Sequence, residues 1–214
     1  MTQCIDIKDN DGYDLENFVL PTHYARDLER VLIPYGLIRD RIEKLAADIA
    51  ADCTNPVVAC CVLKGAHGFF AHLMESLKKQ KDRKAESIPL SFEFIKVKSY
   101  ENTESTGNVY ISLSEEDMKS FKGKDLLICE DIIDTGRTMV ALIEKLKKYE
   151  PASIRVVSLL LKKTPRSNQY VPEYVGFAIP DLFVVGYCLD YNEHFRDLDH
   201  IAVISEHGKQ AYAV

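Results

Sequence analysis

The sequence predicts an α/β fold with a central, mainly parallel sheet flanked by helices. Continuous apolar runs of strand length, such as Val57–Leu63 and Ile154–Leu161, alternate along the chain with segments of helix length. Strands of a parallel sheet are buried on both faces, so they are apolar throughout rather than at every second position. The length of 214 residues suits one domain with one buried core.

Three helices are expected between these strands. Leu37–Ala51 and Thr138–Tyr149 each place apolar side chains at helical spacing on one face. Gly65–Lys79 is expected to form the helix that follows the strand Val57–Leu63.

The other expected strands are of two kinds. Ser91–Val97 and Val109–Leu113 mostly alternate polar and apolar residues, whereas Asp125–Cys129, Leu182–Cys188 and Ile201–Ile204 resemble the buried runs.

The last two of these strands have no clear helix between them. We expect them to form a small hood lobe together with the N-terminal residues. The chain is therefore interpreted as a single domain, 1–214, with a core of about residues 37–180 and a hood of about residues 1–36 and 181–214.

The charge balance excludes some classes of partner. The chain has 27 basic and 33 acidic side chains, a net charge of −6, which disfavours general binding of nucleic acid or of an anionic membrane. The basic cluster at residues 78–84 is interpreted as a solvated surface. No apolar run approaches the roughly 20 residues of a membrane span.

The six cysteines are expected to be reduced. Cys60, Cys61, Cys129 and Cys188 lie in apolar runs, and no C-x-x-C pair supports a zinc site. The N-terminus has no cationic region followed by an apolar one, so we expect a cytoplasmic protein.

A polar stretch, Lys98–Gly107, lies between two alternating runs. Two interpretations are equally consistent with its composition: a solvated hairpin loop, or a mobile lid over a site.

The most informative segment runs from Leu126 to Thr138. An apolar strand leads into the adjacent carboxylates Glu130 and Asp131, then a short loop, then a helix. The N–H groups that begin a helix are unpaired and bind anions, and Gly136 would let the backbone close around a phosphate.

The two carboxylates would repel a phosphate that they touched, so they should face a hydrogen-bond donor beside it. A vicinal diol fits, because carboxylates accept hydrogen bonds from hydroxyls. Phosphate beside a diol describes a ribose 5-phosphate. The ordinary structural alternative is an acidic cap at a helix start. The segment is not a Walker A loop, and the chain contains no G-x-G-x-x-G fingerprint for dinucleotides.

The string Glu130–Thr138 resembles the phosphoribosyl-diphosphate signature of the type I phosphoribosyltransferases, and other segments resemble the hypoxanthine-guanine members of that family. The likeness covers nearly the whole chain, from about residue 12 to about residue 206. The segments that carry it are Leu63–Ala66, Lys98–Tyr100, Ser105–Gly107, Lys162–Ser167, Phe183–Tyr187 and Leu189–Glu193.

The resemblance implies the type I phosphoribosyltransferase fold and a pentosyl transfer in purine salvage. Ribose 5-phosphate would move from phosphoribosyl diphosphate to hypoxanthine or guanine, giving IMP or GMP and pyrophosphate, with Mg²⁺ as cofactor. Self-association as a homodimer or homotetramer is also implied.

The resemblance further implies residue roles at the ribose and the purine. Asp134 would be the general base that accepts the purine N7 proton, a role that competes with that of a helix cap. Glu130 and Asp131 would hold the ribose hydroxyls, directly or through the metal's waters. The loop residues that would cradle the 5-phosphate are Thr135, Gly136, Arg137 and Thr138. Those that would contact the purine are Ile132, Lys162, Phe183 and Val184.

The remaining implied roles concern pyrophosphate, metal and the mobile loop. Lys64, Gly65 and Arg196 would bind pyrophosphate, at a loop where family members often have a non-proline cis peptide. Asp190 would bind Mg²⁺ at the pyrophosphate side, and Glu130 and Asp131 would also be metal-binding residues. Ser99 and Tyr100 would belong to the mobile loop.

Two positions depart from the family pattern. Ala66 stands where glycine is frequent, and Arg137 stands where lysine is common. A positive φ at residue 66 would strain the alanine, and arginine and lysine are different donors. Neither change removes a proposed catalytic group. An alternative function is a weakly active or non-catalytic regulatory homologue that binds nucleotides. The presence of Asp134 and the net negative charge favour an active enzyme over this alternative.

Overall fold

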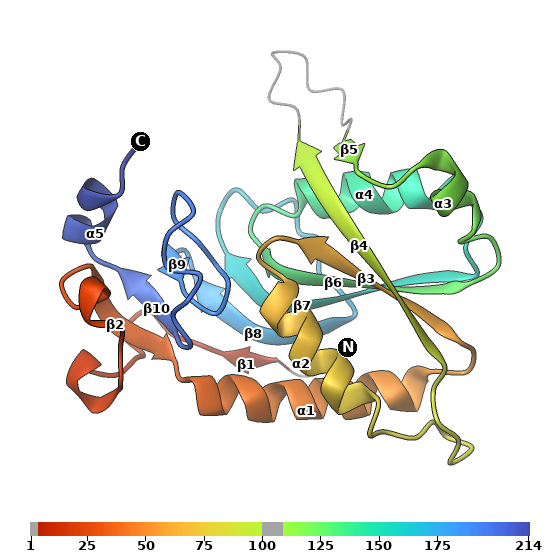
Figure 1. The fold of residues 1–214 in the computed structure, drawn as a ribbon, viewed down its shortest axis with the longest axis horizontal. Helices are drawn as coiled ribbons and strands as arrows, with labels where there is room; N and C mark the ends of the chain where they lie inside the picture. The colour runs from red at the N-terminus through yellow and green to blue at the C-terminus, as the bar shows by residue number, and fades with distance from the viewer. Residues whose placement is uncertain (1–3, 100–108) are drawn as a thin grey trace.

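The computed structural model describes residues 4–99 and 109–214, and it contains two sheets (Figure 1). The larger sheet has seven strands in the order β1-β8-β7-β6-β3-β4-β5. All neighbours in it are parallel except β4 and β5. Its strands are β1 (Ile5–Asp6), β3 (Val57–Leu63), β4 (Leu90–Ser99), β5 (Val109–Ile111), β6 (Asp125–Ile133), β7 (Ser153–Lys163) and β8 (Tyr174–Pro180).

Helices cover both faces of this sheet. The strand β3 is apolar throughout because its side chains enter a core on each face. Val57, Ala59 and Cys61 belong to one core, to which the helices α1 (Tyr35–Asp52) and α2 (His67–Leu77) contribute. The alternate residues of β3 belong to a second core with α3 (Glu115–Lys119) and α4 (Arg137–Lys147). Residues 57–62 are therefore buried on both faces of the sheet, as the mainly parallel prediction requires, and Leu63 at the end of the strand is partly buried.

The smaller sheet is antiparallel, with the order β2-β10-β9. It joins β2 (Leu28–Ile33), from the N-terminal part of the chain, to β9 (Val184–Val185) and β10 (Ile201–Ile204), and α5 (Glu206–Ala211) follows. These elements lie together at one end of the molecule (Figure 1). The strand β1 differs from our expectation for residues 1–36, because it pairs with β8 at the edge of the large sheet.

Several element bounds differ from the sequence prediction. The strand β6 continues to Ile133, so Glu130 and Asp131 lie on the strand rather than after it. Leu182–Cys188 is wrong as a strand of that length, since β9 covers only Val184–Val185 and residues 186–188 have positive φ. Strand β8 was not predicted at all. The expected lid, Lys98–Gly107, lies almost wholly outside the described residues, as does Tyr100, whereas Ser99 ends β4.

All six cysteines are free thiols. Burial raises the pKa of Cys60 and of Cys61 to about 12, and it raises the pKa of Cys129 strongly as well. These thiols therefore behave as small apolar side chains. Among the helices of the described residues, none has the length and apolar content needed to span a bilayer.

A buried arginine ties α1 to β8. The side chain of Arg41 is 7% exposed, and it donates through Nε to the carbonyl of Gly176 (3.0 Å) and through Nη2 to that of Val175 (2.9 Å). These carbonyls lie on a strand whose packing is close, because a Cβ at residue 176 would lie 2.5 Å from the Leu159 carbonyl oxygen.

Replacing Arg41 by methionine should destabilise the protein by about 2–4 kcal/mol, because two buried carbonyls lose charged donors. Chemical denaturation measures this loss. The control is Arg83→Met, which removes only an exposed ion pair with Asp52 and should change stability by less than about 0.5 kcal/mol. Equal effects of the two substitutions would contradict the role of Arg41.

Candidate active site

The predicted site residues converge at the carboxyl ends of β3, β6 and β7. The carboxyl ends of parallel strands lie on the same side of a sheet. Pairs such as Cys61–Cys129 and Ile132–Leu160 fix the register of these strands. The carboxylates on β6, Lys162 on β7 and the loop after β3 are thereby brought together. Ligands of open α/β sheets bind at this edge.

The loop after β6 forms an open helix N-terminus. Gly136 is the N-cap residue of α4, with φ +77° and no side-chain cap. Its hydrogen is needed, because a Cβ there would lie 2.3 Å from Asn168 Oδ1. Thr135 Oγ1 accepts a long hydrogen bond (3.5 Å) from the Arg137 N–H, and the side chains of Arg137 and Thr138 are exposed. The helix start thus has the form of an anion site.

Asp134 does not cap this helix, which removes the ordinary structural explanation for the residue. Its Oδ1 atom is shielded from solvent and makes no hydrogen bond. Its Oδ2 atom lies 3.5 Å from the Nζ of Lys162, whose side chain is only 10% exposed. The Oδ1 atom faces the Nη2 of Arg166 at 3.8 Å, beyond hydrogen-bond distance. A shielded acceptor that makes no hydrogen bond is suited to receive a proton from a ligand.

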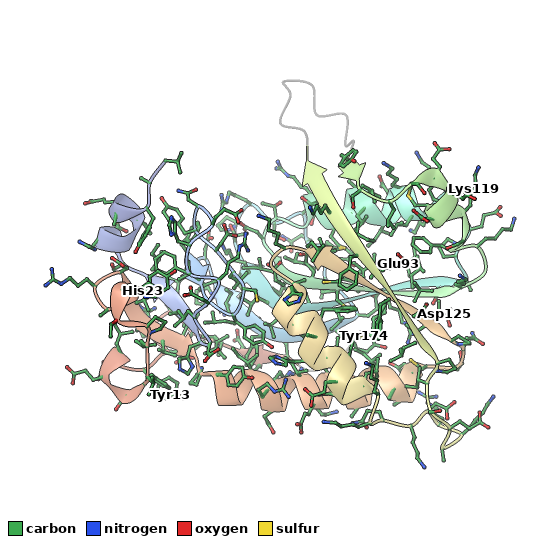
Figure 2. All side chains as sticks on the ribbon, in the orientation of Figure 1. Tyr13, His23, Glu93, Lys119, Asp125 and Tyr174 are labelled. Atoms are coloured by element: carbon green, nitrogen blue, oxygen red, sulfur yellow. The ribbon has the colours of Figure 1, made fainter. Side chains whose placement is uncertain are left out.

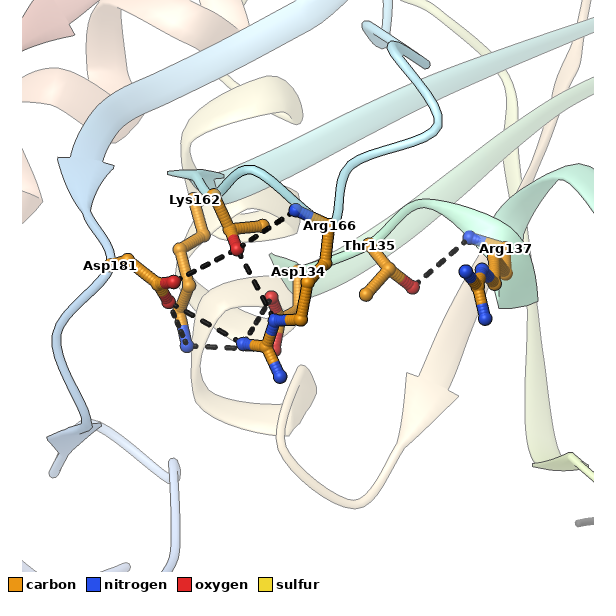
Figure 3. A network of polar contacts seen from close by, with 7 residues as sticks. Asp134, Thr135, Arg137, Lys162, Arg166 and Asp181 are labelled. Atoms are coloured by element: carbon orange, nitrogen blue, oxygen red, sulfur yellow. Dashed lines mark hydrogen bonds and ion pairs between the residues drawn. The ribbon is translucent and has the colours of Figure 1, made fainter.

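A second carboxylate shares the same cations, as Figure 3 shows. Asp181 Oδ1 lies 4.0 Å from Lys162 Nζ and 3.5 Å from Arg166 Nη2, and Arg166 is also 3.8 Å from Asp134. Thr164 donates to Asp181 Oδ2 at 2.9 Å. Lys162 is therefore held between two carboxylates, so its direction is fixed before a ligand arrives.

Glu130 and Asp131 form a partly buried acidic pair. Burial, together with the neighbouring charge of Asp131, raises the pKa of Glu130 well above its usual value, and burial also raises the pKa of Asp131. Asp131 Oδ1 accepts from the Ile132 N–H at 2.7 Å. Such a pair favours a hydroxyl donor or a cation beside it.

Asp131 also meets the loop after β3. A Cβ at Gly65 would lie 1.6 Å from Asp131 Oδ2, so no other residue fits there while Asp131 keeps this position. The peptide Leu63–Lys64 is cis. Ala66 has φ −71°, so the positive φ that would have strained it does not arise.

A cluster of charges faces this loop from the segment after β9. Arg196 contacts Asp190 (2.8 Å) and donates to the Cys188 carbonyl (2.7 Å). Glu193 contacts both Lys64 (2.8 Å) and Arg196 (3.4 Å). Three of the residues expected at pyrophosphate and metal, Lys64, Arg196 and Asp190, are thus within one network.

A cavity of about 220 Å³ unites all four predicted purine contacts with three of the predicted carboxylates. Phe183 is 44% exposed, and its ring meets Tyr191 edge to face at 5.2 Å, which leaves a flat apolar surface available. The residues that line the cavity are Asp131, Ile132, Asp134, Lys162, Phe183, Val184, Leu189 and Asp190.

A larger cavity, about 600 Å³, lies at the opposite edge of the sheet. It is lined by first residues of strands, including Asp125 and Tyr174, and by none of the predicted site residues. Asp125 lies far from the small lobe, where His23 marks the other end of the molecule (Figure 2). We favour the smaller cavity, because it combines a flat aromatic ring with convergent charges at the carboxyl ends of strands.

Sequence reasoning assigned no role to Asp181, Arg166, Thr164 or Glu193. Thr164, Arg166 and Glu193 stand inside segments that carry the family resemblance, so a signal existed for them. The only sequence signal for Asp181 is that it lies close to Phe183 in the chain. Its contact with Lys162 results from the pairing of β7 with β8.

Comparisons with known proteins identify the family of the chain. A model described as the phosphoribosyl transferase domain matches residues 35–192, which defines the class of protein. The hypoxanthine-guanine phosphoribosyltransferases of Homo sapiens and Bos taurus are each 52% identical over 205 residues, covering 95% of this chain and 94% of theirs. The crystal structure of hypoxanthine-guanine phosphoribosyltransferase from Schistosoma mansoni in complex with IMP matches with a TM-score of 0.80 and 37% identity. That match covers 99% of this chain and 100% of the other.

The chain belongs to the hypoxanthine-guanine phosphoribosyltransferase family.

Proposed function

We propose that this protein transfers the 5-phosphoribosyl group from phosphoribosyl diphosphate to hypoxanthine or guanine, giving IMP or GMP and pyrophosphate. The observation that carries the proposal is the pair Asp134–Lys162 in the 220 Å³ cavity. One side chain offers a shielded oxygen to N7–H, and the other offers donors to the 6-oxo group. The family relationship supports the same activity.

In this reaction the bond from C1 of the ribose to the pyrophosphate oxygen breaks, and pyrophosphate leaves with the electron pair. The purine N9 forms the new bond to C1, and the N7 proton moves to Asp134. The base becomes a better nucleophile as it loses that proton while C1 gains positive charge. Phe183 would stack on the purine, beside Ile132 and the backbone of Val184.

The phosphate and ribose subsites follow from the loop after β6. The open N-terminus of α4, with Thr135, Gly136, Arg137 and Thr138, would hold the 5-phosphate. The paired carboxylates of Glu130 and Asp131 would accept from the ribose hydroxyls.

The residues present also fit a divalent metal, which we propose to be Mg²⁺. Asp131 and Asp190 line the same cavity and supply carboxylate oxygens, with Glu130 adjacent. Among the residues described, no group of three or more potential ligands gathers, and Mg²⁺ bound by one or two carboxylates plus phosphate oxygens needs none. When bound, the metal would neutralise the charge on pyrophosphate.

We also propose that the protein is a homodimer or homotetramer in the cytoplasm. Phe92 and Phe94 on β4 are exposed, and both meet Phe70 edge to face at 5.6 Å, so an apolar patch is available for self-association. Six free thiols suit a reducing compartment.

A turnover assay with phosphoribosyl diphosphate, Mg²⁺ and hypoxanthine tests the function. We expect IMP and pyrophosphate in equal amounts, with guanine giving GMP. Binding of IMP without turnover would instead support the non-catalytic alternative.

A further inference from the structure

A tight turn presents Glu193 to the two cations of the proposed pyrophosphate subsite. Tyr191 and His194 exchange two backbone hydrogen bonds (3.2 and 3.0 Å), and the two residues between them, Asn192 and Glu193, have φ of 50° and 70°. These are features of a two-residue hairpin. The Glu193 N–H also donates to Asp190 Oδ2 at 2.9 Å, which fixes the backbone of the turn.

The carboxylate of Glu193 contacts both Lys64 and Arg196. Its Oε2 lies 2.8 Å from Lys64 Nζ, and its Oε1 lies 3.4 Å from Arg196 Nη2. Each oxygen thus faces a different cation, as two oxygens of a phosphate group would. The Lys64 ammonium first, and Arg196 second, lower the pKa of Glu193, so the side chain is an anion at neutral pH.

The guanidinium of Arg196 is held in place independently of Glu193. Its Nη1 donates to the Cys188 carbonyl at 2.7 Å, and its Nη2 lies 2.8 Å from Asp190 Oδ1. Its Nε is shielded from solvent without a hydrogen-bond partner. Removing the Glu193 charge therefore leaves the cation where it is.

Resting on the proposed function, we infer that Glu193 is a resident anion of the pyrophosphate subsite, which competes with pyrophosphate for Lys64 and Arg196 and so sets how tightly that product binds. Its side chain is 64% exposed and that of Lys64 is 60% exposed, so the carboxylate has room to move away. Exposed ion pairs are weak, and pyrophosphate carries more charge. The carboxylate returns when the product leaves.

The test is calorimetric titration with pyrophosphate at fixed MgCl₂, comparing the wild type, Glu193→Gln and Glu206→Gln. Glutamine has the size of glutamate but no charge, so the first variant should bind pyrophosphate about 2- to 5-fold more tightly, the worth of an exposed ion pair. Glu206 pairs with Lys209 in α5 and makes no contact with the subsite, so its variant removes the same net charge and should match the wild type.

A second arm separates competition from a merely structural role. In a Lys64→Met background, Glu193→Gln should change pyrophosphate affinity less than it does in the wild type, because one of the contested cations is absent. Unchanged or weaker binding by Glu193→Gln would overturn the inference, and so would an equal gain by Glu206→Gln. Wild-type turnover of hypoxanthine is measured on the same samples, so a failure of the proposed function is recognised separately.

Discussion

Asp134→Asn should lower the turnover of hypoxanthine by about 10²- to 10⁴-fold at saturating substrates, the usual effect of losing a general base. Asparagine cannot accept the N7 proton. The fold persists, because the N-cap of α4 is Gly136 and no helix start depends on the Asp134 side chain. Lys162 and Arg166 both keep a carboxylate partner in Asp181.

Single-turnover kinetics measures this effect, so that product release does not mask the chemical step. The matched comparison is Asp181→Asn, which removes a carboxylate from the same pair of cations but has an oxygen already occupied by Thr164. We expect a far smaller loss of rate from it. Equal losses would show that the charge of the cluster, rather than proton transfer at Asp134, sustains the reaction. GMP binding and thermal unfolding verify that each variant is folded.

The second large effect concerns the choice of purine. We expect kcat/KM for hypoxanthine and guanine to exceed that for adenine by about 10⁴- to 10⁵-fold, the discrimination that a site reaches when a buried polar group is left unpaired. The ammonium of Lys162 is a donor only and is nearly buried between Asp134 and Asp181. A 6-oxo group accepts from it, whereas the 6-amino group of adenine places two donors face to face.

Lys162→Gln should narrow this preference, because an amide oxygen accepts from an amine. Lys163→Gln is the control, since the next side chain on β7 binds Asp6, on the edge strand β1, and the Ile7 carbonyl. The measurement is kcat/KM for the three purines with each variant. A preference that survives Lys162→Gln undiminished would remove Lys162 from the recognition of the 6-oxo group.

Elements with strong local patterns could be predicted from the sequence. Val57–Leu63 and Ile201–Ile204 have the predicted bounds, because their apolar runs end at polar or loop-forming residues. Strand β8 escaped prediction because it contains Gly176 and ends at Pro180, both typical of turns. Gly176 instead lets the backbone of β8 approach the Leu159 carbonyl closely, a contact that is visible only in the folded chain.

The candidate site shows the same division. The residues of the segment Glu130–Thr138 are neighbours in the chain, so their joint role could be predicted from their order and chemistry. The partners that orient these residues come from distant parts of the chain. Asp181, which follows β8, helps to fix the direction of the Lys162 side chain, and Asn168 packs against Gly136. Such pairings depend on strand register and loop path, which local patterns do not determine.

The absent side chain at Gly65 has a consequence for how this sequence can change over generations. Asp131 Oδ2 occupies the space that a Cβ at residue 65 would need, so two distant stretches of the gene encode one close contact. A lineage that acquires any larger residue at 65 must already have shortened or moved the acid at 131, and the reverse order leaves a damaged intermediate. Among diverging copies, a larger residue at 65 is therefore expected only where the aspartate at 131 has already been shortened or moved.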